Sequence, residues 1–169
     1  MKVSLRFIVF ALCLVATATL ALRSVQIIYP LAIAIAAIVA FTERIPLRIS
    51  KTIENRLAIG VAVLFIMRWM VLPAPSLGAT RVPFVAIGML DYAQAYPIAQ
   101  ALLLWMVLQL FIRPGNAFPA TFPLYPALVI ILAGTMPTRV LGETGKIAYQ
   151  IAALLAAFLI SLYFLLHAP

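Results

Sequence analysis

Cys13 and His167 are the only cysteine and the only histidine in the sequence. A cysteine nucleophile with a histidine base would therefore have to consist of these two residues. They lie near opposite ends of the sequence, and Cys13 sits in an apolar run with no base beside it to generate a thiolate. No His and Glu recur at the helical spacing that a zinc site requires, and there are only four acidic residues. We therefore predict that the chain is not an enzyme, and we expect no catalytic residue, no bound metal and no cofactor.

Asp91 is the one acidic residue that stands next to a long apolar run without a basic cluster beside it. Gln94 follows one helical turn later, and Gln100 and Gln109 lie further along the same run. Ionisable groups deep in a membrane usually serve a function, so this series is a candidate lining for the path of a cation or another substrate. The tyrosines that follow Asp91 are, however, typical of a membrane interface, where an aspartate commonly caps the start of a helix. We favour the cap, and a functional role for Asp91 and Gln94 stays open.

Arg68 is a third polar position to consider, because it interrupts the apolar run of residues 57–72 next to Trp69. An arginine at the centre of a bilayer costs about 2.5–3.5 kcal/mol on insertion scales. We therefore expect the side chain of Arg68 to extend to the headgroups, and we keep it as a tentative functional position.

Residues 43–56 form a short loop in which basic and apolar residues alternate. Its isoleucines recur every four residues, which places them on one helical face and leaves the cations available to anionic headgroups or to a partner. These cations are Arg44, Arg48, Lys51 and Arg56. We favour an ordinary basic anchor that sets the orientation of the chain over a specific docking site.

The composition indicates the elements that must hold these residues. Of 169 residues, 66% are hydrophobic and 9% are charged, whereas about 25% are charged in a typical soluble domain. So few polar side chains cannot cover a surface in water, and a bilayer is the solvent that suits the rest. The net charge of +8 does not indicate nucleic-acid binding, because the bases are spread between apolar runs rather than clustered.

Six apolar runs predict an all-α protein, a single transmembrane domain over residues 1–169 built as a polytopic bundle of about six spans. We expect these spans at about residues 6–22, 25–42, 57–73, 92–112, 120–137 and 147–167. The first and third runs are short, and we expect Arg6, Arg23 and Arg68 to complete them by extending to the headgroups. The first run also has features of a signal peptide, but its retention in a helical hairpin with the second is the simpler interpretation.

The bases between the runs predict the orientation of the chain. With the N-terminus inside the cell, more of them fall on the inner side, and most of those lie in the loop of residues 43–56. We predict a multi-pass protein of the bacterial inner membrane with both termini in the cytoplasm.

Small residues and prolines predict how the helices pack. Alanines recur every four residues in the second run, at Ala32, Ala36 and Ala40, and likewise in the last, which allows close helix contact. Prolines crowd the entry to the fifth run, so we expect an irregular lead-in there. This lead-in is either a tight turn or part of a substrate path, as in transporters with broken helices, and we favour the turn.

Two neighbouring runs resemble a known family. Residues 96–113, YPIAQALLLWMVLQLFIR, and residues 122–134, FPLYPALVIILAG, are separated by a polar turn and preceded by a helical hairpin and a basic loop. This order resembles the amino-terminal membrane domain of bacterial membrane-anchored transglutaminase-like proteins. The resemblance implies that this chain corresponds to the anchoring part. In that family a papain-like Cys-His-Asp domain follows the helices outside the membrane, and it has no counterpart in the residues printed here, so no catalytic residue carries over.

From these observations we predict a membrane anchor or scaffold with no catalytic site of its own. Its expected partners are the lipid bilayer and either other membrane subunits or a fused or associated soluble domain, and no nucleic acid. The alternative is a small transporter, or the membrane substrate-binding component of one, with its site near Asp91 and the proline-broken fifth run.

Overall fold

The computed structural model describes residues 4–23, 28–42, 50–71, 92–113, 118–135 and 142–167. Over these ranges the chain is all-helical, with six helices and no strand. The helices are α1 (Leu5–Arg23), α2 (Ile28–Phe41), α3 (Lys51–Val71), α4 (Tyr92–Ile112), α5 (Leu124–Thr135) and α6 (Gly142–His167). The predicted all-α class is thus confirmed for these ranges.

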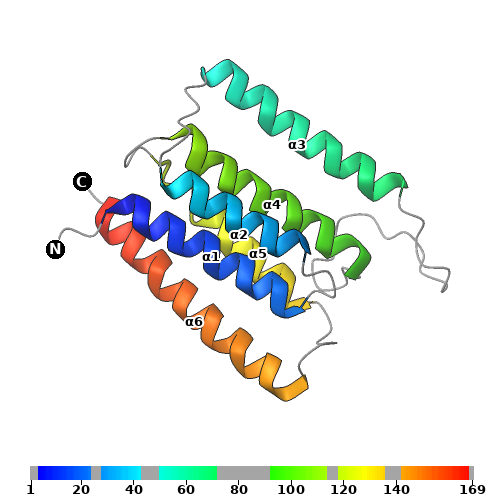
Figure 1. Cartoon of the computed structure of the whole chain (residues 1–169), viewed down its shortest axis with the longest axis vertical. Coiled ribbons are helices and arrows are strands. Elements are labelled where there is room, and N and C mark those ends of the chain that lie inside the picture. Colours follow the sequence, from blue (N-terminus) through cyan, green and yellow to red (C-terminus); the bar gives the residue numbers. More distant parts are fainter. Residues whose placement is uncertain are drawn as a thin grey trace.

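Successive helices run in opposite directions, so the assembly has two distinct ends (Figure 1). One end, which we call the Arg113 end, collects the beginnings of α1, α3 and α5 and the last turns of α2, α4 and α6. The opposite end, which we call the Arg23 end, contains the last turns of α1, α3 and α5 and the beginnings of α2, α4 and α6. Both marked termini lie at the Arg113 end (Figure 1).

Helix α1 lies at the centre of the bundle and packs against α2, α4, α5 and α6. Its sequence is apolar on every side, and a helix of this kind is stable only when it is surrounded. Its buried residues are Leu5, Arg6, Ile8, Val9, Leu12, Cys13, Ala16, Thr17, Thr19 and Leu20. Most of the hydrophobic core therefore forms around α1.

Helix α3 lies at the edge of the bundle, where it packs against α4 (Figure 1). Its contact side is a stripe of half-buried residues, Glu54, Leu57, Ala58 and Val61, and no residue of α3 whose exposure is described is fully buried. Helix α6 also lies at the periphery, against α1 and α5, and many of its large apolar side chains are exposed.

Three helices are long and apolar enough to cross a membrane, namely α1, α4 over Ala95–Ile112 and α6 over Thr144–His167. Helices α2 and α5 are apolar but shorter.

The observed bounds differ from the predicted segments mainly at α3 and α6. Helix α3 begins at Lys51 rather than at residue 57, so the last residues of the predicted basic loop form its first two turns. Helix α6 begins at Gly142 rather than at residue 147, so residues 142–146 are helical. A charged or glycine-containing segment can extend an apolar helix, because hydropathy marks the apolar part and not the helix end.

The packing face of α2 also differs from the prediction. The buried residues are Pro30, Ile33, Ala37 and Ala40, whereas Ala32 is exposed. The alanine repeat thus lies partly beside the contact face, because the larger Ile33 fits against the core. In α6 the repeat does face the bundle, with Ala156 buried.

The lead-in to α5 is irregular, as the prolines predict. Residues 120–123 form a turn, in which the N–H of Phe122 donates to the carbonyl of Pro119 at 2.9 Å. Phe118 and Phe122 are buried, and the Phe122 ring stacks on Tyr163 of α6. This segment is therefore a packed turn among the described residues.

Candidate functional site at the Arg113 end

Arg6 is a buried cation on the first turn of α1, with 7% of its surface exposed. Its Nη2 donates to the carbonyl of Ala40 at 2.7 Å, and its Nη1 donates to the carbonyl of Arg113 at 3.1 Å. These carbonyls belong to the C-terminal ends of α2 and α4, where the last carbonyls lack helical partners and carry partial negative charge. Arg6 therefore joins the ends of three helices.

This position corrects the interpretation of Arg6 as a headgroup anchor. The guanidinium does not extend away from the bundle, because two helix ends offer it acceptors within the protein. A guanidinium has several donors in fixed directions, so it can bond both ends at once, which an ammonium group does less well.

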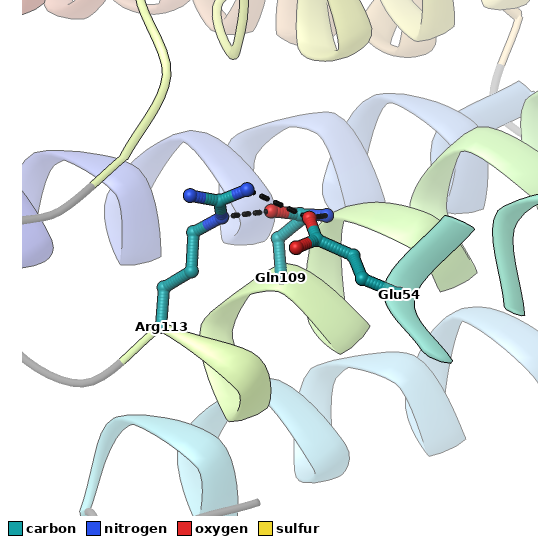
Figure 2. Close-up of polar contacts among 3 residues, drawn as sticks. All are labelled: Glu54, Gln109 and Arg113. Carbon is teal, nitrogen blue, oxygen red and sulfur yellow. Dashed lines mark hydrogen bonds and ion pairs between the residues drawn. The ribbon is translucent and has the colours of Figure 1, made fainter. Parts of the chain in front are cut away.

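Glu54 of α3 and Arg113, just after α4, form the second part of this end (Figure 2). The Nη2 of Arg113 lies 2.7 Å from Oε1 of Glu54, and Gln109 Nε2 donates to the same oxygen at 3.0 Å. The Nε of Arg113 donates to Oε1 of Gln109 at 2.6 Å. The three side chains thus close a ring of contacts between α3 and α4, which with Arg6 we call the Arg113 cluster.

The pKa of Glu54 reflects this setting. Burial raises it, but the hydrogen bonds from Gln109 and Arg113, with the positive charges of Arg113 and Lys51, outweigh burial and hold the pKa below its usual value. The carboxylate is therefore ionised at neutral pH and stays paired with Arg113, whose side chain is 28% exposed against 15% for Glu54.

A hydrogen bond from a side chain to a backbone carbonyl also connects α6 to the residues that precede α5. The hydroxyl of Tyr163 donates to the carbonyl of Pro119 at 2.7 Å, and its ring stacks on His167 with centroids 5.5 Å apart.

At the Arg23 end, Arg23 lies over the ring of Tyr149 at 4.4 Å, and the hydroxyl of Tyr149 donates to the carbonyl of Ile130 at 2.7 Å.

The polar side chains described so far connect one helix to another, and the side-chain oxygen of Gln100 does not do so among the described residues. Its side chain is 1% exposed and its Oε1 has no hydrogen-bond partner among the described residues. Its backbone carbonyl accepts a bond from the hydroxyl of Tyr29 at 2.5 Å. One turn before it, Pro97 lies within α4 and has no N–H to give to the carbonyl of Ala93.

Most of the residues that the sequence singled out are not placed by the structure. Asp91, Arg44 and Arg48 lie outside the described residues. Gln94 is in the first turn of α4 and Arg68 in the last turn of α3, but neither side chain is described.

The other two, Lys51 and Arg56, are exposed on the first two turns of α3. The structure thus shows neither a site at Asp91 nor its absence, and it brings together a different set of residues.

Sequence reasoning missed the Arg113 cluster, although a signal for it exists. Arg6, Glu54 and Arg113 each lie at the edge of an apolar run, and all three fall on the same predicted side of the membrane. One acid between two bases at one membrane level is a pattern from which pairing can be expected. The prediction assigned the bases to lipid headgroups and to the orientation of the chain, and it did not consider that they could pair within the protein.

The cluster can hold helices together, and nothing in it resembles a reaction centre. Within the described residues no group of three or more His, Cys, Asp or Glu side chains comes together. Cys13 is buried in the core around α1, far along the sequence from His167.

No protein-family model, curated protein or solved structure matches the chain.

Proposed function

We propose that this chain is a multi-pass membrane anchor that holds a larger protein or complex at a bacterial inner membrane. The observation that carries the proposal is the use of polar side chains in the described helices. Arg6, Glu54, Arg113 and Tyr163 each connect one helix or its end to another. The polar groups thus keep the helices in fixed relation, which suits a static platform.

The surface of the bundle suits a hydrocarbon environment. Large apolar side chains of α2, α3, α5 and α6 are exposed, for example Leu31 at 58%, Leu64 at 67% and Leu154 at 73%. Water would disfavour such a surface strongly, whereas lipid chains would cover it at no cost. This supports a topology in which α2, α3 and α5 cross the membrane together with α1, α4 and α6, giving about six spans.

The distribution of charge supports cytoplasmic termini. Among the described helices, Arg6, Lys51, Arg56 and Arg113 lie at the Arg113 end, which also holds the start of α1 and the end of α6, whereas Arg23, Arg68 and Lys146 lie at the Arg23 end. Because basic residues are retained on the cytoplasmic side, the Arg113 end is the inner end in this proposal.

The attached partner is a soluble domain, fused or associated, or another membrane subunit. The resemblance to membrane domains of transglutaminase-like proteins agrees with a soluble domain carried by the helices, and in this proposal the catalytic work belongs to that domain. No residue of the described helices takes part in it.

Orientation is tested by cysteine labelling. In a Cys13→Ala background, single cysteines replace Ser50 before α3 and Lys146 near the start of α6. A membrane-impermeant maleimide applied to intact spheroplasts is expected to label the position of Lys146 and to reach that of Ser50 only after permeabilisation. The reverse pattern would overturn the orientation, and labelling of both in intact cells would overturn the spanning topology.

Anchoring is tested by removing the chain from cells and comparing membrane and cytosolic fractions. A soluble partner that cross-links to the chain in wild-type membranes is expected to move to the cytosolic fraction in the deletion strain. Restoring the chain on a plasmid should return it to the membrane. A partner that stays with the membrane without the chain would contradict the proposal.

One observation favours the alternative, a small transporter. Gln100 presents a buried oxygen that has no hydrogen-bond partner among the described residues and lies near the proline in α4, and such groups mark substrate paths in some transporters. If that function holds, solute flux into proteoliposomes should depend on the chain, and Asp91→Asn should abolish it while the protein stays folded. No flux with a panel of cations and small metabolites would remove the alternative.

A further inference from the structure

We infer that the outer face of α3 is a binding site for an anionic phospholipid, an inference that rests on the proposed membrane location. The outer face of α3 is the line of residues opposite its contact with α4. It consists of Thr52, Arg56, Ile59, Val63 and Met67, which recur every three or four residues and are all exposed.

The outer face of α3 is polar at its N-terminal end and apolar along the rest, as a phospholipid is polar at its headgroup and apolar along its acyl chains. Thr52 and Arg56 offer a hydroxyl donor and a guanidinium one turn apart, and Ile59, Val63 and Met67 follow without a polar interruption. Ile59 is 63% exposed and Met67 is 59% exposed. A phosphodiester beside Arg56 therefore places its acyl chain along the apolar part of the same face.

An adjacent glycine adds room for the chain. At Gly60 nothing lies within 4 Å of the place where a Cβ would stand, so the helix surface is recessed there. Gly60 is next to Ile59 and one turn below Arg56. A flexible hydrocarbon chain can fill such a recess at low cost.

Charge decides which lipid the face prefers. Glu54 is the only acidic residue of α3, and it is turned toward α4 and paired with Arg113. Arg56 is exposed and has no hydrogen bond or ion pair within the described part of the chain, whereas Lys51, which is also exposed, interacts electrostatically with Glu54. A zwitterionic headgroup would find no carboxylate on α3 for its amine, whereas an anionic headgroup meets uncompensated positive charge.

The partial burial of α3 leaves its outer face available to a lipid. Since α3 has only half-buried contacts with α4, a lipid on its outer face covers surface that the protein itself leaves open. The lipid can therefore cover this face without competing with the contact between α3 and α4.

The test uses the full chain in detergent, titrated with phosphatidylglycerol or with phosphatidylcholine of the same acyl chains. Bound lipids are counted by native mass spectrometry, and unfolding is followed by circular dichroism. Wild type is expected to bind phosphatidylglycerol more tightly. The double variant Lys51→Gln/Arg56→Gln should lose about fivefold in affinity per side chain, since each base near an anionic surface contributes about 1 kcal/mol.

Two further variants keep the test decisive. Arg56→Lys retains the charge and should keep most of the preference, so a double variant that misfolds does not end the experiment. Lys146→Gln, a charge change at the Arg23 end, should leave the preference unchanged. The inference is overturned if the double variant still prefers phosphatidylglycerol, or if Lys146→Gln weakens it as much.

Failure of the lipid site is distinguishable from failure of the proposed function. Extraction of cell membranes with alkaline carbonate is done first, on the wild-type chain. Release of the chain by carbonate would contradict the membrane proposal itself. A chain that stays in the membrane but shows no lipid preference contradicts only the site on α3.

Discussion

Replacing Arg6 by methionine removes a buried cation from the junction of three helices while keeping a long, flexible side chain. Two hydrogen bonds are lost, to the carbonyls of Ala40 and Arg113 at 2.7 and 3.1 Å. Bonds to a charged donor contribute about 1.5–3 kcal/mol each. The charge also interacts favourably with the C-terminal ends of α2 and α4, by up to about 2 kcal/mol in buried geometry.

The cost of burying the charge of Arg6 in the wild type reduces the loss of stability expected from these interactions. Methionine does not require the removal of a charge from water, a cost of several kcal/mol that the buried guanidinium carries. The two carbonyls that lose their donor are the acceptors of these same two bonds, so they add no separate loss. We expect a net loss of about 2–4 kcal/mol in the free energy of unfolding.

The assay is reversible unfolding in mixed micelles, in which the denaturing detergent is increased and the helix content is followed by circular dichroism. Arg6→Lys should fall between methionine and wild type, because one ammonium group reaches both carbonyls less well. Lys146→Gln serves as the control, since it removes an exposed charge at the other end. Arg6→Met with wild-type stability would refute the reasoning, because it would mean that the two bonds merely offset the burial of the charge.

Four other substitutions probe separate positions. Glu54→Gln should cost about 1 kcal/mol at neutral pH. Because the pKa of Glu54 is lowered in the folded chain, its stabilisation is present above the unfolded pKa and lost as the pH falls through the folded one, so stability measured from pH 7 to pH 3 should converge with that of the variant. Gln100→Met should raise the unfolding free energy by about 1 kcal/mol, since it removes a buried oxygen that has no hydrogen-bond partner in the described part of the chain, and a loss of stability would contradict this expectation. Gly134→Ala would place a Cβ 2.5 Å from the hydroxyl of Tyr149 and should cost about 1–3 kcal/mol, whereas Gly60→Ala, with nothing within 4 Å, should be neutral or stabilising by up to about 1 kcal/mol in the same unfolding assay.

Several features of the fold were predictable from local sequence. The predicted run of residues 92–112 coincides with α4, and the irregular lead-in before α5 follows from its prolines. Hydropathy and the missing N–H of proline act within a few residues, so the sequence carries them directly. The start of α3 was predicted too late, because Lys51, Glu54 and Arg56 lower hydropathy without preventing helix formation.

The candidate site was less predictable than the fold. A count of basic residues indicated an orientation, but it could not show that Arg6 is buried or that Glu54 turns toward Arg113. The alanine repeat of α2 likewise indicated close packing without identifying the face, and the structure places Ile33 and Ala37 in contact rather than Ala32.

The sequence by itself determined that the described part of the chain consists of apolar helices, and roughly where each helix lies, because hydropathy depends on neighbouring residues. Only the tertiary structure decided which polar groups meet. Arg6 binds carbonyls that are 34 and 107 residues away, and Glu54 binds a guanidinium 59 residues away. Such contacts depend on how helices far apart in the sequence are arranged, since a buried charge is tolerated only where acceptors converge on it.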